Sequence, residues 1–418
     1  MIGNLFTTAL GSLERSPYTF ALVQEVAGSN LPKTFMTRTS NERVDVAAGQ
    51  FGGTVAFFGS GWGLDKLLNW AYKRFAHIDL NALKESTVPI AAMEKRHLWA
   101  ISGKSAAIFA IQGALYWAVP FARNILTAKR TGSGNFADVI TNGNQQPVTT
   151  EQKRAKAQEA KEKIAYCKRM VCKILGGGAL VALGALGLAA VGIKRGWGIG
   201  QLKGQWGNKL LETFALARGD LGNYPKWSQF LFIAVASYAG WIHAVRDKFE
   251  LKEQLLQFGG FLFGWFGPPA WAKTLFNKRF QSLLEKHVPN KTDADALYKK
   301  VMGTNWNGTE GKSLSIGEVE KHLAHLPEVA QKAKALCAKQ TGFGLLVSAI
   351  LLGAIPQFIN WQLTAGRMAS KNAGGDIKQA SSTAAMLAPV SPVQQAALRR
   401  FNAFAQPYNP AIQQAQRA

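Results

Sequence analysis

The residues whose types and spacing best suit a metal are two histidines and a glutamate. His322 and His325 lie three positions apart, and Glu318 precedes His322 by one helical turn, so one helix face would carry all three. A zinc site needs three or four protein ligands, and a lone HxxH pair without a further ligand is more typical of a solvated helix face. We therefore predict no metal site here.

A second candidate is the polar loop over residues 305–318, which faintly resembles a calcium-binding EF-hand. Calcium prefers charged oxygens at the first loop positions, whereas this loop offers Asn and Thr, is two residues too long, and contains Lys312. A plain helix–loop–helix hairpin explains it better. Two capping boxes would frame that hairpin, one from Thr292 to Asp295 and one from Ser315 to Glu318.

The remaining motifs for chemistry are weaker still. GWGIG at residues 196–200 has part of a dinucleotide-loop pattern but follows a predicted helix rather than a strand. Gly103-Lys104-Ser105 has the end of a phosphate loop, yet Leu98 occupies the place of its first glycine. Cys337 has no assignable His–Asp companion. We predict a protein that is not an enzyme, with no catalytic, cofactor-binding or metal-binding residue.

The element around which the chain is organised is Ile174 to Ile193. This segment holds no charged residue and no Asn, Gln, Ser or Thr, and it is rich in Leu, Ala and Gly. As a helix it would be about 30 Å long, the thickness of a bilayer's hydrocarbon core. Gly178 and Ala182, and Ala185 and Ala189, are small residues four apart, so another helix could approach closely, with larger Leu and Val facing lipid. A second copy of the chain could be that partner, giving a homo-oligomer.

Five further uncharged runs surround this segment. They cover residues 46–64, 105–122, 227–245, 255–272 and 340–366. We therefore predict an all-α integral membrane protein with about five to six apolar helices. The run 46–64 is the weakest because it contains six glycines, and Pro268-Pro269 should break the run 255–272 near its end. Inside the runs the only ionisable residue is His243, which argues against a secondary active transporter.

Short words recur in the same order in the two halves of the chain. The paired words are 50–53 and 257–260 (QFGG), 73–75 and 278–280 (KRF), and the elements Pro120, Asn124 and 126–128 with Pro356, Asn360 and 363–365. Each lies at the edge of an apolar run, and Pro17 and Pro225 precede the two QFGG words by similar distances. We predict two tandem repeat units, roughly 15–130 and 223–367, joined by a helical connector.

These patterns give a complete domain organisation. We expect an N-terminal amphipathic region (1–45), a first membrane repeat unit (46–130), a linker and basic helix (131–173), a central apolar helix (174–193), an amphipathic loop and membrane hairpin (194–272), a basic helical insert (273–340), a last membrane helix (341–367) and a disordered tail (368–418). The basic helix should start at a Thr149–Gln152 capping box, and its apolar residues follow a narrow seam at spacings of three and four.

The net charge of the chain indicates which partners it binds but does not determine its orientation in the membrane. Lys and Arg number 49 against 25 Asp and Glu, for a net charge of +24, which suits anionic lipid headgroups better than a specific nucleic-acid site, since the cations are dispersed around apolar runs. Three cysteines provide no disulfide framework. The cations divide almost equally between alternate loops, so orientation stays open. We favour at least one run, 46–64, that does not cross.

Three functions remain open. The first is a non-enzymatic scaffold or assembly protein of a membrane, expected to be a bacterial cytoplasmic membrane. The second is a facilitator or channel formed between the two repeat units. The third is a membrane-associated protein that binds polyanions. The lack of Asp, Glu, Lys and Arg inside the apolar runs favours the scaffold over the other two functions.

Overall fold

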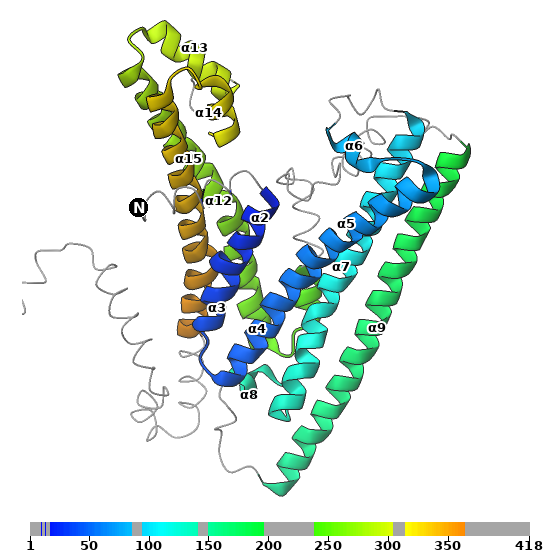
Figure 1. The fold of residues 1–418 in the computed structure, drawn as a ribbon. Coiled ribbons are helices and arrows are strands. Elements are labelled where there is room, and N and C mark those ends of the chain that lie inside the picture. The colour runs from blue at the N-terminus through cyan, green and yellow to red at the C-terminus, as the bar shows by residue number, and fades with distance from the viewer. Residues whose placement is uncertain are drawn as a thin grey trace, which may run out of the picture. The chain divides into compact units, whose positions relative to one another are not determined.

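The computed structural model describes residues 10, 13, 17–85, 94–140, 149–195, 238–303 and 314–363. Within these ranges all regular elements are helices, and there is no strand (Figure 1). Three of the described helices are long and apolar enough to cross a membrane: α7 (Lys95–Thr131), α9 (Thr150–Arg195) and the helix Pro327–Leu363. The chain is therefore all-helical with helices of membrane-spanning length, which confirms the expected fold class at that level.

The first half consists of two long helical runs preceded by a shorter one. The shorter run is α2 (Pro17–Val23), π-helical η1 (Gln24–Asn30) and α3 (Leu31–Phe35), and the first long run is α4 (Ser40–Thr54), η2 (Val55–Gly59), α5 (Ser60–Ala71) and η3 (Tyr72–Ala76). A short helix, α6 (Leu80–Glu85), follows, and α7 is the second long run. The Thr39 side chain accepts a hydrogen bond from the Glu42 N–H and so starts α4. Gly132, at φ 67°, ends α7 in a left-handed conformation that suits glycine.

The predicted basic helix and central apolar helix form one element, α9. The Thr149–Gln152 capping box is confirmed, because each residue's backbone N–H donates to the other's side chain, at 3.1 and 3.3 Å. The predicted seam is also visible, since Ala160 and Cys167 are buried while their neighbours on the helix are largely exposed. The seam continues into the apolar part of α9 as Ala182, Ala189 and Gly192.

Helix α9 lies antiparallel along α7, and its small residues make the contact (Figure 1). Gly178 lies against Ala114, Ala189 against Gly103, and Gly192 against the Trp99 ring, each so closely that an added Cβ would overlap its neighbour. The larger residues of α9 are exposed on other faces: Leu180, Val181, Leu183 and Leu188. The prediction that small residues would pack on an apolar helix while Leu and Val face outward is confirmed.

In the second half, α12 (Lys248–His287) packs against α15 (Pro327–Ser348) and the π-helical η6 (Ala349–Ala354). The prediction that Pro268-Pro269 breaks this helix is wrong, because α12 continues without interruption to His287. Proline removes backbone hydrogen bonds from a helix interior, and the packing of α12 on α15 and η6 offsets that loss.

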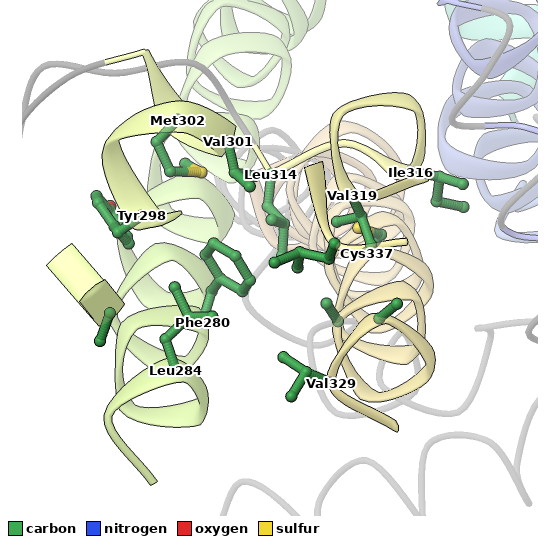
Figure 2. Packing of buried hydrophobic residues seen from close by; sticks show 14 residues of the cluster. Phe280, Leu284, Tyr298, Val301, Met302, Leu314, Ile316, Val319, Val329 and Cys337 are labelled. Carbon is green, nitrogen blue, oxygen red and sulfur yellow. The ribbon is translucent and has the colours of Figure 1, made fainter. Parts of the chain in front are cut away.

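The insert folds as a small helical head with its own core. Its helices α13 (Lys291–Met302) and α14 (Ile316–His322) cover the end of α12 and the start of α15. Figure 2 shows Phe280, Leu284 and Val319 among the side chains that fill the space between them. Ser315 caps α14 as predicted, with its hydroxyl accepting from the Glu318 N–H at 3.3 Å. The predicted Thr292 cap is wrong, because Asn290 accepts from the Thr292 N–H and Thr292 already lies inside α13.

The two halves interlock through their first helical segments. Residues 17–35 lie against α15 and η6 of the second half, where Gly28 meets Ser348 and Pro32 meets Gly353. In the opposite direction, the helical residues 238–243 lie against α7 of the first half, where Gly240 meets Trp117. The predicted GWGIG motif, most of the 305–318 loop and the tail 368–418 lie outside the described residues.

Candidate functional site

Seven charged side chains meet where α4, α7 and α12 come together. We call them the arginine cluster: Arg38, Glu42, Asp45, Arg123, Arg246, Glu250 and Glu253. All of these side chains are at most 15% exposed, and all except Arg38 and Glu253 are at most 4% exposed. Charges are rarely buried unless they are paired. The pairing is therefore what makes this cluster possible.

Two of the arginines are held in the same way. The Arg246 guanidinium donates to Glu250, four residues later, at 2.8 Å and to Asp45 of α4 at 2.8 and 3.0 Å. The Arg38 guanidinium donates to Glu42, again four residues later, at 2.6 Å and to Glu253 of α12 at 2.9 and 3.1 Å. Each arginine thus joins a carboxylate of its own half to one of the other half.

The backbone repeats this arrangement. The Arg38 N–H donates to Glu42 at 2.5 Å, and the Arg246 N–H donates to Glu250 at 2.7 Å, so both glutamates fold back on the start of their helix. Such a carboxylate near a helix N-terminus also opposes the positive end of the helix dipole. Arg123 of α7 closes the cluster, with its guanidinium contacting Glu250 and lying 3.6 Å from Asp45.

An aromatic ring lies between the two matched arginines. Phe136 of α8 (Phe136–Ile140) has the Arg246 guanidinium 5.0 Å and the Arg38 guanidinium 5.8 Å from its ring centre. Its backbone N–H donates to Asp247 at 3.1 Å, and the Thr39 hydroxyl donates to the Val139 carbonyl at 2.7 Å. Helix α8 therefore bonds to residues of both halves beside the cluster.

The carboxylates of the cluster should make the fold sensitive to acid. Burial alone would raise the pKa of Asp45, but the Arg123 and Arg246 guanidiniums outweigh it and hold that pKa below its ordinary value. The pKa of Glu250 is likewise lowered, with burial opposed by Arg246 and Arg123. A lowered carboxylate pKa adds stability above the unfolded-state pKa, and this stability is lost as the pH falls through the folded-state pKa.

We therefore expect the thermal midpoint of the detergent-solubilised protein to be constant between about pH 7 and pH 5 and to fall by about 5 °C or more below about pH 4. Thermal scans at a series of pH values measure this. Asp45→Asn removes one of the titrating groups and should flatten the acid limb. A midpoint that is the same at acidic and neutral pH would contradict the prediction.

A second polar group lies away from the cluster, among apolar residues. We call it the interior polar cluster: Glu25, Lys33, Gln50, Tyr116 and Tyr238. Lys33 is 4% exposed, and its ammonium group donates to the side-chain amide oxygen of Gln50 at 3.4 Å. Glu25, Gln50 and Tyr116 are half-buried, and the Glu25 carboxylate lies within electrostatic range of Lys33 and of both tyrosines. Because Tyr238 belongs to the second half and the other four to the first, this group too joins the halves.

Neutral polar side chains extend the interior polar cluster. The Gln24 amide donates to the Ser348 hydroxyl at 2.8 Å, and the Asn30 amide donates to the Thr54 hydroxyl at 2.6 Å. Gln24 and Asn30 are fully buried. Among the described residues the Asn30 side-chain oxygen has no hydrogen-bond partner.

A third set of charges lies at the opposite end of the first half. Lys104 of α7 is 3% exposed and lies 2.5 Å from Asp65 and 2.7 Å from the Asn69 side-chain oxygen, both in α5. Asp65 follows Asp45 by twenty residues, so the two levels of charge are about 30 Å apart along the helix. Gln50 and Tyr116 lie between these levels, five residues after Asp45 and seven before Arg123.

The residues singled out from the sequence do not assemble into a site. Glu318 and His322 form a pair at 3.2 Å on α14, and no group of three or more metal-ligating side chains occurs in the part of the chain that the structure describes. Cys337 is buried in the core of the head. Lys104, discarded as part of a phosphate loop, pairs with Asp65.

Sequence reasoning missed both polar clusters. The charges of the arginine cluster lie just outside the apolar runs, and Glu25 and Lys33 lie in a region that was interpreted as amphipathic. One sequence signal could have revealed the arginine cluster. An arginine is followed four residues later by a glutamate and after three more by a second acidic residue. This pattern occurs at positions 38, 42 and 45 and again at 246, 250 and 253, each time shortly before a QFGG word.

Comparison with known protein families, curated proteins and solved structures gives no match for this chain. The arguments for function therefore rest on the geometry of the two clusters and on the apolar helices.

Proposed function

We propose that this chain is a multi-pass membrane facilitator, without enzymatic activity, whose pathway lies between two tandem repeat units of about residues 15–130 and 223–367. The observation that carries the proposal is the interior polar cluster, which groups from both units form among apolar helices. Ionisable residues at depth in a membrane are costly and usually serve transport or binding. Inner sites between repeats are typical of transporters and facilitators.

Matched contacts support the repeat units. One contact joins Pro32 to Gly353, and another joins Gly240 to Trp117. Gly240 is the position equivalent to Pro32, 208 positions later, and Trp117 is the position equivalent to Gly353, 236 positions earlier. The large and small partners have thus changed places between equivalent contacts. Contacts at corresponding positions of the two units are what a duplication predicts.

Two further contacts match when the first displacement is 208 positions before the QFGG word and 207 positions after it, as between residues 50 and 257. Gln112 donates to the Phe57 carbonyl at 2.6 Å, and the equivalent positions are Ser348 and Gly264, which lie 3.4 Å apart in the same kind of bond. Asn30 bonds Thr54 at 2.6 Å, and at the equivalent positions the rings of Tyr238 and Phe261 lie 5.4 Å apart. A polar pair in one unit thus corresponds to an aromatic pair in the other.

The charge levels support a membrane position for these units. The arginine cluster and the Asp65–Lys104 pair are separated by about the thickness of a bilayer's hydrocarbon core. Trp62 and Trp70, close to Asp65, are 57% and 59% exposed, which is typical of aromatic residues at a membrane interface. On this basis we propose that the run 46–64 also crosses the membrane, contrary to the expectation drawn from its six glycines.

A reconstitution experiment tests the facilitator. Proteoliposomes with the full chain should take up glycerol or glycine, as a neutral and a zwitterionic probe, faster than protein-free liposomes. Glu25→Gln should reduce that uptake roughly tenfold. The variant removes one charge-assisted hydrogen bond between the Glu25 carboxylate and the probe, of about 1.5–3 kcal/mol, and so lowers the occupancy of the site by the probe by at least that factor. Glu151→Gln, at the exposed start of α9, is the matched control and should leave uptake unchanged.

The scaffold is the second candidate, and the exposed apolar surface of α9 favours it. Leu180, Val181, Leu183 and Leu188 are 63–72% exposed, a surface for lipid or for a second copy of the chain. If the folded protein accelerates neither probe, the facilitator is refuted and a scaffolding role with anionic lipid as partner remains. Retention of polyanions at low salt would test the third function.

A further inference from the structure

The arginine cluster divides its bonds between the two halves in a particular way. Arg38 is bonded to Glu42 of its own half and Glu253 of the other, and Arg246 to Glu250 of its own half and Asp45 of the other. Arg123 lies between Asp45 of its own half and Glu250 of the other. Every arginine of the cluster therefore has a carboxylate partner in its own half and another in the opposite half.

This inference rests on the proposed function. We propose that the arginine cluster is the gate that closes the pathway at its end of the bundle, and that it opens by breaking only the bonds between the two halves. The bonds within each half persist in the open state.

The physical reason lies in the cost of unpaired charge. Separating a buried ion pair normally leaves an uncompensated charge, which is strongly unfavourable. Here the separation leaves Arg38 with Glu42, Arg123 with Asp45, and Arg246 with Glu250. Paired arginines in both states keep the two states close in free energy, as a gate requires.

The two ends of the first half differ in this respect. At the opposite end, Lys104 pairs with Asp65, and both belong to the first half. At the arginine cluster, three ion pairs join the two halves: Arg38–Glu253, Arg123–Glu250 and Arg246–Asp45. A pathway between the halves is therefore closed by charge at this end. The Phe136 ring, which has both the Arg38 and the Arg246 guanidinium over it, would lose one of these contacts when the two arginines separate.

The test compares two carboxylates that hold the same arginine. Val139 of α8 is fully buried beside the cluster, so a cysteine there reports opening. In a chain whose native Cys167, Cys172 and Cys337 are replaced by alanine, Val139→Cys is labelled with a membrane-impermeant maleimide. Glu253→Gln weakens the bond between the halves and should raise the labelling rate about tenfold. Glu42→Gln weakens a bond within one half that is present in both states, so it should not accelerate labelling. Glu151→Gln, at the exposed start of α9, is the control that should leave the rate unchanged.

Equal acceleration by both variants would mean that the cluster is only structural, and no acceleration by either would mean that it does not close anything; both results overturn the gate. Glu253→Asp, a milder change, should give an intermediate rate and serves if Glu253→Gln does not fold. Labelling that responds to Glu253→Gln alone supports the gate. Because labelling needs no transported solute, a lack of glycerol or glycine uptake would refute the facilitator separately.

Discussion

Replacing Arg246 with alanine is expected to destabilise the fold by about 3–5 kcal/mol, the usual cost of removing one partner from a buried ion pair. The variant would leave the Asp45 and Glu250 carboxylates, both 1% exposed, with Arg123 as their remaining cationic neighbour. Thermal unfolding of the detergent-solubilised chain, followed by its tryptophan fluorescence, measures the loss. Conditions at neutral pH keep both carboxylates charged.

Two variants make this prediction specific. Arg130→Ala removes an exposed guanidinium that donates to Asn41 at 2.9 Å, and it should change stability by less than about 0.5 kcal/mol. Arg246→Lys should fall between the two, because a lysine cannot bond two carboxylates with a planar fork. If Arg246→Ala proves as mild as Arg130→Ala, the cluster does not hold the halves together.

The second large effect is expected at Ala189 on α9. This residue is fully buried against Gly103, so there is no room for a larger side chain. Ala189→Leu should separate α9 from α7 and cost about 1–3 kcal/mol or more, the range for overpacked interiors. Adding Ala185→Leu should enlarge the effect. Membrane insertion should not decrease, since leucine favours the bilayer at least as well as alanine.

The neighbouring alanine provides the control. Ala190→Leu makes the same chemical change at an exposed position of the same helix and should leave the thermal midpoint unchanged. Membrane-fraction yield and thermal midpoint together separate insertion from packing. Equal midpoints for the Ala189 and Ala190 variants would show that α9 acts only as an anchor and that its small residues are unimportant.

The helices themselves followed from local patterns. A long uncharged run, the Thr149–Gln152 capping box and the small residues Gly178 and Ala189 were sufficient to predict α9 and the face by which it packs. These signals are local, because capping involves residues three apart and close packing needs small residues on one helix face. The error at Pro268-Pro269 came from relying on a local signal alone. These prolines do not end α12, because contacts with distant helices outweigh the missing backbone hydrogen bonds.

By itself the sequence determined an all-helical chain, helices of membrane-spanning length, and where several of them begin. Only the tertiary structure decided which charges meet. Asp45 and Arg246 are 201 positions apart in the chain, so no local sequence rule connects them. Their bond exists because α4 and α12 begin at the same place in the bundle. The same holds for Glu25 and Lys33, whose surroundings come from α4, α7 and residue 238. Burial turns a charge that looks solvated in sequence into one that must be paired, and burial is a property of the packed helices alone.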